Sequence, residues 1–393
     1  MSEFKGFILN GEYFDGDWII ANFEQLHPQQ FDPFERQVLN FSGQWLSGEQ
    51  TFHVRTSGST GKPKNIALKR PQMISSARMT GRALDLAAAD RALVCLPVTA
   101  IGGLMMLVRG FVLNLQMTIV TPTRNPFEEV RRLKNIGQPN PPQFDFVALL
   151  PLQMHTIVNA AENLISKING MKAILLGGAP VSPGLLNQIK KIKAPVYHTF
   201  GMTETASHIA LRRLNGARAS EYFQVLPEVE IDQDEKGCLT IRSPITNNRK
   251  LTTHDLIEMP SKTRFRWLGR LDNVINSGGV KVPAEKIERV IESILPEIAG
   301  GKLCGKAFFV CGTPDEKFGE VVTFVFEGMP LAEKSQKQLR KGLSQKLPKF
   351  EIPRRFLSLE KFTYTANGKL HRSANCEQIV RTYCLNENSK CVI

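Results

Sequence analysis

Short apolar runs alternate with longer amphipathic segments between about residue 90 and residue 200. The runs have the length of buried strands and lie at 92–96, 117–120, 144–150, 172–176 and 195–198. The segments between them have helical character and lie at 126–134, 152–167 and 182–193. Because strands that alternate with helices form βαβ units, this pattern predicts an α/β fold with a mostly parallel sheet flanked by helices.

The pattern changes near residue 220. A β-hairpin is expected over 223–242 with its turn at 234–237, and short strands continue beyond it. We therefore predict an N-terminal domain, 1–269, that ends in a small β subdomain at about 220–269.

A third pattern follows the β subdomain. It contains a helix from about 283, apolar strands near 306–311 and 320–326, and a helix near 333–347. This mixture predicts a small α+β C-terminal domain, 270–393.

Composition supports a globular protein with more than one domain. The 393 residues are too many for one ordinary core, and 42% are hydrophobic and 22% charged. No apolar run reaches the about 18 residues that a membrane span requires. Seven cysteines, odd in number and without Cys-x-x-Cys spacing, argue against a zinc site and a disulfide framework. Because no secretory signal is recognisable either, we expect a cytoplasmic protein.

The formal net charge of +13 is spread along the chain rather than gathered in one block. A basic balance suits nucleic acid, anionic lipid or anionic small molecules. Since no basic block or aromatic-interleaved basic motif occurs, we expect no nucleic-acid partner. The oligomeric state stays open.

The stretch Arg-Thr-Ser-Gly-Ser-Thr-Gly-Lys-Pro-Lys at 55–64 has the parts of a phosphate-binding loop. Its glycines allow a tight turn in which backbone N–H groups converge on an anion, while hydroxyls and lysines add donors and charge. Only two residues separate the glycines, so it is not a Walker A loop. A solvated turn is the alternative. The candidate phosphate ligands are Thr56, Ser57, Gly58, Ser59, Thr60, Gly61, Lys62 and Lys64.

Two further motifs follow predicted strands, where ligands of parallel sheets bind. Gly177-Gly178-Ala179 follows the strand at 172–176, and His198-Thr-Phe-Gly-Met-Thr-Glu-Thr205 begins at the end of the next one. A carboxylate beside phosphates serves mainly to hold Mg²⁺, which predicts Glu204 as a metal ligand. The alternative is a helix start, with Thr203 as the cap.

Together these motifs resemble those of the acyl-adenylate-forming enzymes, the family of acyl-CoA synthetases, firefly luciferase and peptide-synthetase adenylation domains. Five motifs occur in the family's order between residues 55 and 372. The resemblance implies ATP, Mg²⁺ and coenzyme A as ligands. It implies that Thr203 contacts a phosphate and that Glu204 holds the metal. The residues implied at the adenine are Gly177, Gly178, Ala179, His198, Thr199, Phe200 and Gly201.

The family's ribose site carries over to Asp255 and Arg270. A carboxylate can accept the protons of both ribose hydroxyls, and an arginine can donate to the same sugar. Two positions depart from the family: His254 stands where a glycine is typical, and Phe200 where a tyrosine is common.

The C-terminal motifs imply a mobile domain with two faces. Asp272 is the implied hinge, and Gly278, Gly279 and Lys281 belong to the loop that lines the coenzyme A tunnel in the family. Lys369, in Asn-Gly-Lys, corresponds to the catalytic lysine of adenylation.

Within the family, the short segment ahead of the phosphate loop and the Gly-Met-Thr-Glu-Thr-Ala-Ser-His string are most similar to the o-succinylbenzoate–CoA ligases of menaquinone biosynthesis. The family's Pro-x-x-His-x-x-Gly segment occurs at 97–103 without its histidine. Ser207 and His208 are candidates to face a second carboxylate of the acid. The alternative is that both are ordinary helix residues.

The favoured interpretation is an AMP-forming acid–CoA ligase. A ligase for another aromatic or aliphatic acid, and an adenylation enzyme that loads a carrier protein, would show the same motifs. A catalytically dead acyl-binding protein is disfavoured because Lys369, Glu204 and Asp255 are all present. The loop spacing disfavours a phosphotransferase.

Overall fold

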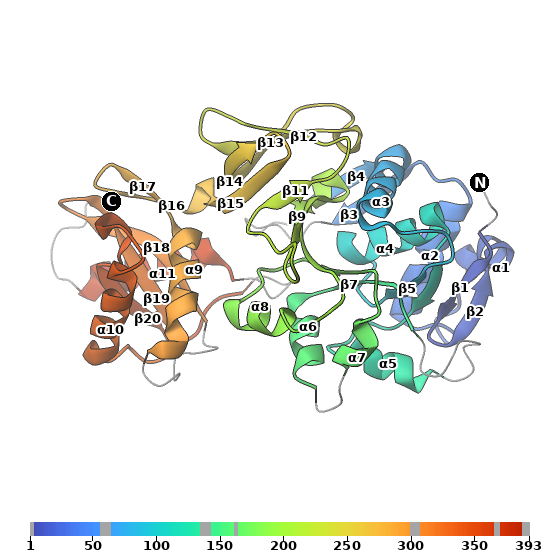
Figure 1. Ribbon diagram of the computed structural model, residues 1–393, viewed down its shortest axis with the longest axis horizontal. Helices are drawn as coiled ribbons and strands as arrows, with labels where there is room; N and C mark the ends of the chain where they lie inside the picture. Colours follow the sequence, from blue (N-terminus) through green and yellow to red (C-terminus); the bar gives the residue numbers. More distant parts are fainter. Residues whose placement is uncertain are drawn as a thin grey trace.

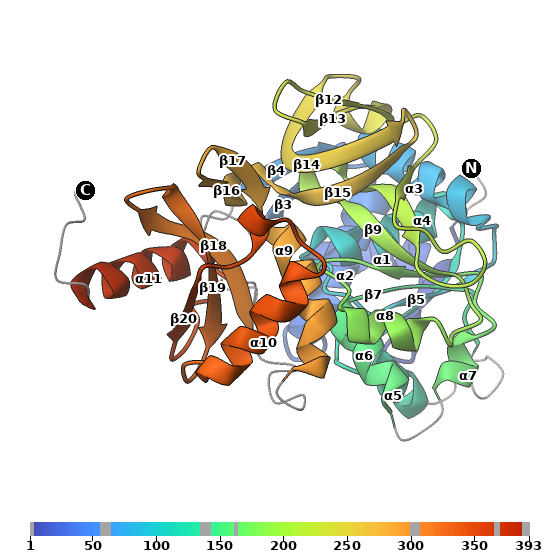
Figure 2. The same ribbon diagram turned by 60° about the vertical axis from the view of Figure 1, so that its left-hand side comes forward.

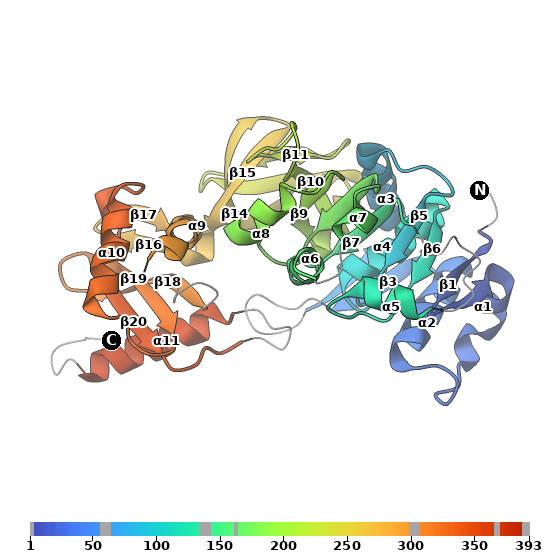
Figure 3. The same cartoon turned by 60° about the horizontal axis from the view of Figure 1, so that its bottom comes forward.

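The computed structural model describes residues 4–55, 64–133, 143–160, 164–298, 307–364 and 370–386. In this part of the chain a 13-stranded sheet and a 5-stranded sheet account for most strands, with a two-stranded hairpin beside them. Figures 1, 2 and 3 show the smaller sheet and its helices at one end of the molecule and the larger sheet at the other. The predicted α/β class is confirmed.

The first half of the large sheet is parallel, as predicted. Its order is β2-β1-β6-β5-β7-β8-β9, and every neighbouring pair from β1 to β9 is parallel. All five apolar runs singled out in the sequence form strands here. The strands are β1 (Gly6–Leu9), β2 (Glu12–Asp15), β5 (Arg91–Val94), β6 (Gln116–Ile119), β7 (Phe146–Leu149), β8 (Ala173–Leu176) and β9 (Val196–Met202).

Helices cover both faces of this parallel region, so its strands are buried on both sides. Along β5, Ala92 and Val94 join one hydrophobic cluster, whereas Leu93 joins the other. This alternation is the two-residue period of a strand. The first cluster includes residues of α2 (Pro33–Leu46), α3 (Arg70–Leu84) and α4 (Ile101–Leu113). The second includes residues of α5 (Pro126–Arg132), α6 (Pro151–Val158), α7 (Ile165–Ile168) and α8 (Pro183–Ile189). Two short helices near the N-terminus are α1 (Gly16–Asn22) and η1 (Phe23–Gln25).

One predicted helix is interrupted. The segment 152–167 was expected to be continuous, but α6 ends at Val158 and α7 starts at Ile165. The side chain of Asn159 donates to the backbone oxygen of His155 at 2.8 Å. An asparagine that bonds to the backbone in this way competes with helix propagation.

The second half of the large sheet is antiparallel and continues directly from β9. Its order is β9-β10-β11-β15-β14-β13-β12. The strands expected in a β subdomain therefore extend the same hydrogen-bonded ladder. They are β10 (Ser207–Arg213), β11 (Phe223–Val225), β12 (Glu230–Gln233), β13 (Cys238–Arg242), β14 (Leu251–Ser261) and β15 (Arg264–Arg270), with η3 (Pro244–Thr246) after β13.

The hairpin predicted over 223–242 is only partly correct. Its turn at 234–237 does join β12 to β13, and the Asp234 side chain accepts from the backbone N–H of Lys236 and of Cys238. Phe223, however, belongs to β11, which pairs with β10 and β15. The first strand of the predicted hairpin is therefore wrong.

The 5-stranded sheet follows η4 (Leu271–Asn273) and has the order β17-β16-β19-β18, with β20 parallel to β19. Two hydrophobic clusters separate from those of the large sheet lie on it: one under α9 and α10, the other under α11. An independent core is what a separate domain requires, although the domain boundary itself stays a prediction. The elements are β16 (Val274–Ser277), β17 (Val280–Pro283), α9 (Ala284–Ile294), η5 (Leu295–Glu297), β18 (Phe308–Asp315), β19 (Gly319–Glu327), α10 (Glu333–Ser344), η7 (Lys349–Glu351), β20 (Arg355–Leu359) and α11 (Arg372–Asn386).

The described helices include none that combines the length and the apolarity needed to cross a membrane.

Candidate active site

The two segments predicted at the adenine lie side by side. Leu176, the last residue of β8, is opposite His198 of β9 in a parallel register, so the turn that follows β8 lies beside the second half of β9. The His198 ring Nε2 lies 3.3 Å from the backbone oxygen of Ala179. The structure thus joins the Gly-Gly-Ala turn to the strand that leads to Glu204.

Gly177 allows this close approach. A Cβ atom at Gly177 would lie 2.6 Å from Thr199 Oγ1, which itself donates to the backbone oxygen of Leu176 at 3.1 Å. A side chain at this position would require the Thr199 side chain to move and to give up its hydrogen bond. The flat wall that the resemblance implies therefore has a local steric cause.

His198 is held as a neutral ring. Arg212 Nη2 lies 3.4 Å from its Nδ1, and because a guanidinium only donates, Nδ1 accepts and Nε2 carries the hydrogen that faces Ala179. Burial, together with the positive charge of Arg212, lowers the pKa of His198 to about 4.

Phe200 is anchored in an aromatic cluster. Its ring meets those of Phe223 and Phe265 at centroid distances of 5.5 and 5.1 Å, both edge-on. Such packing fixes the ring without a hydroxyl. The replacement of the family's usual tyrosine by Phe200 therefore leaves the position of the ring well defined.

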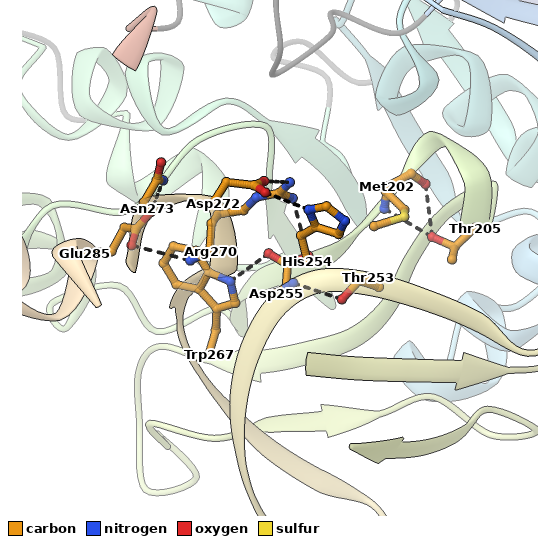
Figure 4. Close-up of polar contacts among 10 residues, drawn as sticks. All are labelled: Met202, Thr205, Thr253, His254, Asp255, Trp267, Arg270, Asp272, Asn273 and Glu285. Carbon is orange, nitrogen blue, oxygen red and sulfur yellow. Dashed lines mark hydrogen bonds and ion pairs between the residues drawn. The ribbon is translucent and has the colours of Figure 1, made fainter. Parts of the chain in front are cut away.

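Thr203 and Glu204 lie in a single 3₁₀ turn, η2 (Thr203–Thr205), between β9 and β10. The buried Thr205 hydroxyl holds the turn, because it accepts from the Met202 N–H at 3.1 Å and lies 2.7 Å from the backbone oxygen of Ser207; Figure 4 shows Met202 beside Thr205. The expected alternative, a helix start, is wrong because the chain reverses directly into β10.

The Glu204 carboxylate is partly buried, and within the described residues it makes no hydrogen bond or ion pair with another side chain. No group of three or more His, Cys, Asp or Glu side chains suited to a metal occurs in the described part of the chain. A metal at this turn would thus depend on Glu204 and on oxygens of a bound ligand, which is how Mg²⁺ is held beside nucleotides.

The phosphate-loop residues Thr56 to Lys62 lie outside the described residues. Their flanks form an antiparallel hairpin, β3 (Thr51–Arg55) and β4 (Asn65–Lys69), with Arg55 opposite Asn65. Strand β4 contacts the η2 turn. Lys64, just ahead of β4, is exposed.

Asp255 and Arg270, predicted at the ribose, face each other across β14 and β15. Asp255 is buried, and its Oδ1 accepts from the Trp267 indole at 2.9 Å. Its Oδ2 lies 3.8 Å from Arg270 Nη1. One carboxylate oxygen is therefore oriented by Trp267, and the other is left beside a cation, as Figure 4 shows.

His254 contacts the predicted hinge. Its Nδ1 lies 2.7 Å from Asp272 Oδ1, and Arg270 donates to Asp272 Oδ2 at 2.9 Å. Burial alone would raise the pKa of Asp272, but the hydrogen bonds from Arg270 and His254 outweigh it and hold the pKa below its usual value. The histidine that departs from the family motif thus contacts the predicted hinge residue. The sequence did not reveal this contact.

Helix α9 is fastened to the strand that precedes the hinge. Arg289 donates to the backbone oxygens of Trp267 and Leu268, each at 2.9 Å. Glu285 packs against Gly269, where a Cβ atom would lie 2.5 Å from its Oε2. Burial raises the pKa of Glu285. Neither residue was singled out from the sequence. Arg289 bonds to backbone oxygens, and Glu285 accepts from the backbone N–H of Arg270 and from the side chain of Asn273.

Gly278 and Gly279 form the two-residue turn of the β16–β17 hairpin. Their φ angles of +61° and +84° are those of a turn that requires positive φ at both central positions, which explains the glycine pair. Both residues and Lys281 are exposed. Lys369 lies outside the described residues.

Ser207 and His208 begin strand β10 rather than a helix, so the expected alternative for them is wrong. Ser207 is partly buried, whereas His208 is fully buried between α3 and α4. Burial, with a smaller contribution from the charge of Arg109, holds the pKa of His208 well below its usual value.

Comparison with known proteins identifies the class. A family model described as AMP-binding enzyme matches residues 51–242. The solved structure of an acyl-CoA synthetase (AMP-forming)/AMP-acid ligase II-like protein from Dyadobacter fermentans is 37% identical, with 91% of this chain and 98% of that chain covered and a TM-score of 0.58. The chain belongs to the AMP-binding enzyme family.

Two further comparisons involve succinylbenzoate–CoA ligases. A 2-succinylbenzoate–CoA ligase from Enterococcus faecalis is 27% identical over 342 residues, which is 80% of this chain and 67% of the relative. The o-succinylbenzoate coenzyme A synthetase from Bacillus subtilis, solved with ATP and magnesium ion, is 23% identical. There 82% of this chain and 68% of that chain are covered, with a TM-score of 0.64, so it shows a shared fold.

The neutral state of His198 predicts a loss of stability in acid. Its pKa is about 4 in the folded protein and about 6.5 in an unfolded chain. Between these values the unfolded chain binds the proton more tightly, so the free energy of unfolding falls as the pH drops from about 6.5 to about 4. The buried His208 acts in the same direction.

Between pH 7 and pH 4.5, we expect the free energy of unfolding of His198→Gln to fall by about 2 kcal/mol less than that of the wild type, because glutamine does not ionise. The measurement is urea-induced unfolding of both proteins at pH 7 and pH 4.5. An equal fall in the two proteins would show that His198 is not neutral in the native state.

Proposed function

We propose that this protein is an ATP-dependent acid–CoA ligase that forms an acyl-adenylate, and that its acid is 2-succinylbenzoate. The observation that carries the proposal is the edge formed by β8 and β9. There the Gly177–Ala179 turn, the His198–Gly201 segment and the η2 turn with Glu204 follow one another around one site. Membership of the AMP-binding enzyme family supports the same reaction.

In the first half-reaction the acid attacks the α-phosphate of ATP and releases pyrophosphate. Residues 177–179 and 198–201 bind the adenine, and Asp255 with Arg270 binds the ribose. The loop 56–64, Thr203 and Lys369 contact the phosphates and the reacting carboxylate. Glu204 holds Mg²⁺, which, when bound, neutralises phosphate charge. Catalysis of this kind depends mainly on positioning and on charge stabilisation.

In the second half-reaction coenzyme A displaces AMP from the acyl-adenylate. We propose that the C-terminal domain rotates about Asp272, so that Lys369 serves the first step and the loop with Gly278, Gly279 and Lys281 serves the second. Hinge closure of this kind is common in enzymes. The bonds of Arg289 to β15 would have to break in one of the two arrangements.

The proposed acid follows from the relatives named as 2-succinylbenzoate–CoA ligases, and it implies a place in menaquinone biosynthesis. A different acid or a carrier-protein acceptor is the second candidate. We also propose a cytoplasmic location, because Cys95, Cys238, Cys311 and Cys376 are all free thiols among the described residues.

The proposed reaction predicts pyrophosphate release that requires ATP, Mg²⁺ and a suitable acid. We expect 2-succinylbenzoate to give the highest rate in a panel of carboxylic acids, with AMP appearing continuously only when coenzyme A is added. Pyrophosphate release that no acid stimulates would contradict the reaction. A higher rate with a carrier protein than with coenzyme A would contradict the acceptor.

Glu204→Gln keeps the shape of the side chain and removes its charge. We expect adenylation to fall by roughly 100-fold or more, the scale for one lost stabilising group. The control is Glu235→Gln, in the exposed turn between β12 and β13. Rates are measured over a magnesium titration. A normal rate for Glu204→Gln at limiting Mg²⁺ would exclude Glu204 as the metal ligand.

Lys369→Ala and Lys281→Ala should separate the two half-reactions. A group that acts in one step alone affects only that step. We expect Lys369→Ala to reduce acyl-adenylate formation, with little effect on the conversion of supplied acyl-adenylate and coenzyme A. Lys281→Ala should do the reverse, and Lys334→Ala, an exposed lysine of α10, is the control. Equal losses in both steps would argue against domain alternation.

A further inference from the structure

His254 closes a hydrogen-bond network beside the predicted hinge. Its Nδ1 lies 2.7 Å from Asp272 Oδ1, and Arg270 Nη2 donates to Asp272 Oδ2 at 2.9 Å. Because the pKa of Asp272 is lowered, its carboxylate is ionised and only accepts, so His254 Nδ1 carries the hydrogen of this bond. Figure 4 shows His254 and Arg270 meeting at this carboxylate. Each oxygen of the predicted hinge residue therefore has a donor.

The same arginine belongs to the predicted ribose site. Arg270 Nη1 lies 3.8 Å from Asp255 Oδ2, which is too long for a hydrogen bond, whereas its Nη2 is engaged by Asp272. The other oxygen of Asp255 accepts from the Trp267 indole at 2.9 Å. One guanidinium thus lies between two carboxylates, and its short contact is to the hinge.

The charges explain why a second donor at the hinge matters. Asp255 and Asp272 are two carboxylates beside the single positive charge of Arg270. In the part of the chain that the structure describes, the side-chain hydrogen bonds of Asp272 come from Arg270 and His254 alone. If Arg270 turns toward Asp255, His254 is the donor that stays with Asp272.

A bound ribose favours that turn. Ribose hydroxyls donate to a carboxylate, as proposed for Asp255, and their oxygens accept from an arginine. Arg270 is then drawn from Asp272 toward the sugar. The Asp272 side chain is 44% exposed, so water replaces a lost partner only in part. The loss costs less when the carboxylate keeps another donor.

The place of His254 on β14 suits this role. His254 and Asp255 are consecutive in the strand, so their side chains leave it on opposite faces. His254 is exposed and Asp255 is buried. His254 can therefore hold Asp272 without taking the place of a ribose at Asp255. A glycine, which is typical of the family here, has no side chain to reach the hinge.

We propose that His254 is a positioning residue that couples the ribose site to the hinge. It keeps Asp272 paired when a bound nucleotide draws Arg270 toward Asp255, and it thereby strengthens nucleotide binding. Because coupling between two sites is reciprocal, the nucleotide in turn loosens the hold of Arg270 on the hinge. This inference rests on the proposed function, in which Asp255 and Arg270 bind the ribose and Asp272 is the hinge.

The test measures AMP affinity by isothermal titration calorimetry, without acid or coenzyme A. His254→Ala removes the donor, His254→Phe keeps a ring without a donor, and His254→Asn places an amide nitrogen near the position of Nδ1. Asp272→Ala removes the acceptor and is measured alone and combined with His254→Ala. His155→Ala, at an exposed histidine of α6, is the matched control.

We expect His254→Ala and His254→Phe to bind AMP roughly 2- to 5-fold more weakly than the wild type, the scale for a partly exposed charged pair. His254→Asn should restore most of the affinity, and His155→Ala should match the wild type. In acid-dependent exchange of pyrophosphate into ATP, KM for ATP should rise by the same factor in His254→Ala, with little change in kcat.

Asp272→Ala distinguishes this coupling from a structural role. Without the carboxylate, Arg270 serves the ribose alone, so we expect AMP to bind at least as tightly as in the wild type. Adding His254→Ala should then cause no further change, because the histidine acts only through Asp272. A histidine that merely stabilises β14 would weaken AMP binding by the same factor in both backgrounds.

The outcomes separate the two proposals. Unchanged AMP affinity in His254→Ala, or an equal loss in both backgrounds, would overturn this inference and leave the proposed reaction standing. A wild-type protein that does not bind AMP would overturn both. His254→Phe tests the inference even if His254→Ala does not fold.

Discussion

The parallel pairing of β8 with β9 is the interaction on which the candidate site depends. It sets Leu176 opposite His198, and it brings the Thr199 hydroxyl to within 2.6 Å of the place where a Cβ atom of residue 177 would lie. The same strand then ends in the η2 turn and reverses into β10. A one-residue slip of β9 would exchange the two faces of the strand and move every group of the site. The predicted adenine wall, the predicted metal ligand and Ser207 therefore depend on one strand register.

A second constraint joins the two sheets. Asp272 receives hydrogen bonds from His254 and Arg270, while Arg289 caps two backbone oxygens at the end of β15. The predicted ribose residues and the predicted hinge thus form one network, because Arg270 contacts both Asp255 and Asp272. Nucleotide bound at Asp255 would act on the same arginine that holds the hinge. Differential contacts of this kind are what a ligand needs in order to shift a domain equilibrium.

Two charged side chains near the candidate site lack an ion-pair partner among the described residues. Glu204 is a partly buried carboxylate and Arg109 a fully buried cation, and neither has an ion-pair partner among the described residues. Charged groups that the fold leaves without an ion-pair partner are expected where a bound ligand supplies the opposite charge. For Glu204 the predicted ligand is a metal ion.

The sequence by itself determined the α/β class, the parallel strands and the residues at the strand ends, because these depend on local periodicity and on short motifs. It did not predict that β11 pairs with β10 and β15, that Ser207 begins a strand, or that helix 152–167 is interrupted. In the sequence alone, Arg109 is one charged residue in an apolar helix, and His254 is a departure from a motif. Their contacts with Ser207 and Asp272 join positions 98 and 18 residues apart. Only the tertiary structure decides such contacts, because burial and charge compensation depend on elements that are distant in the chain.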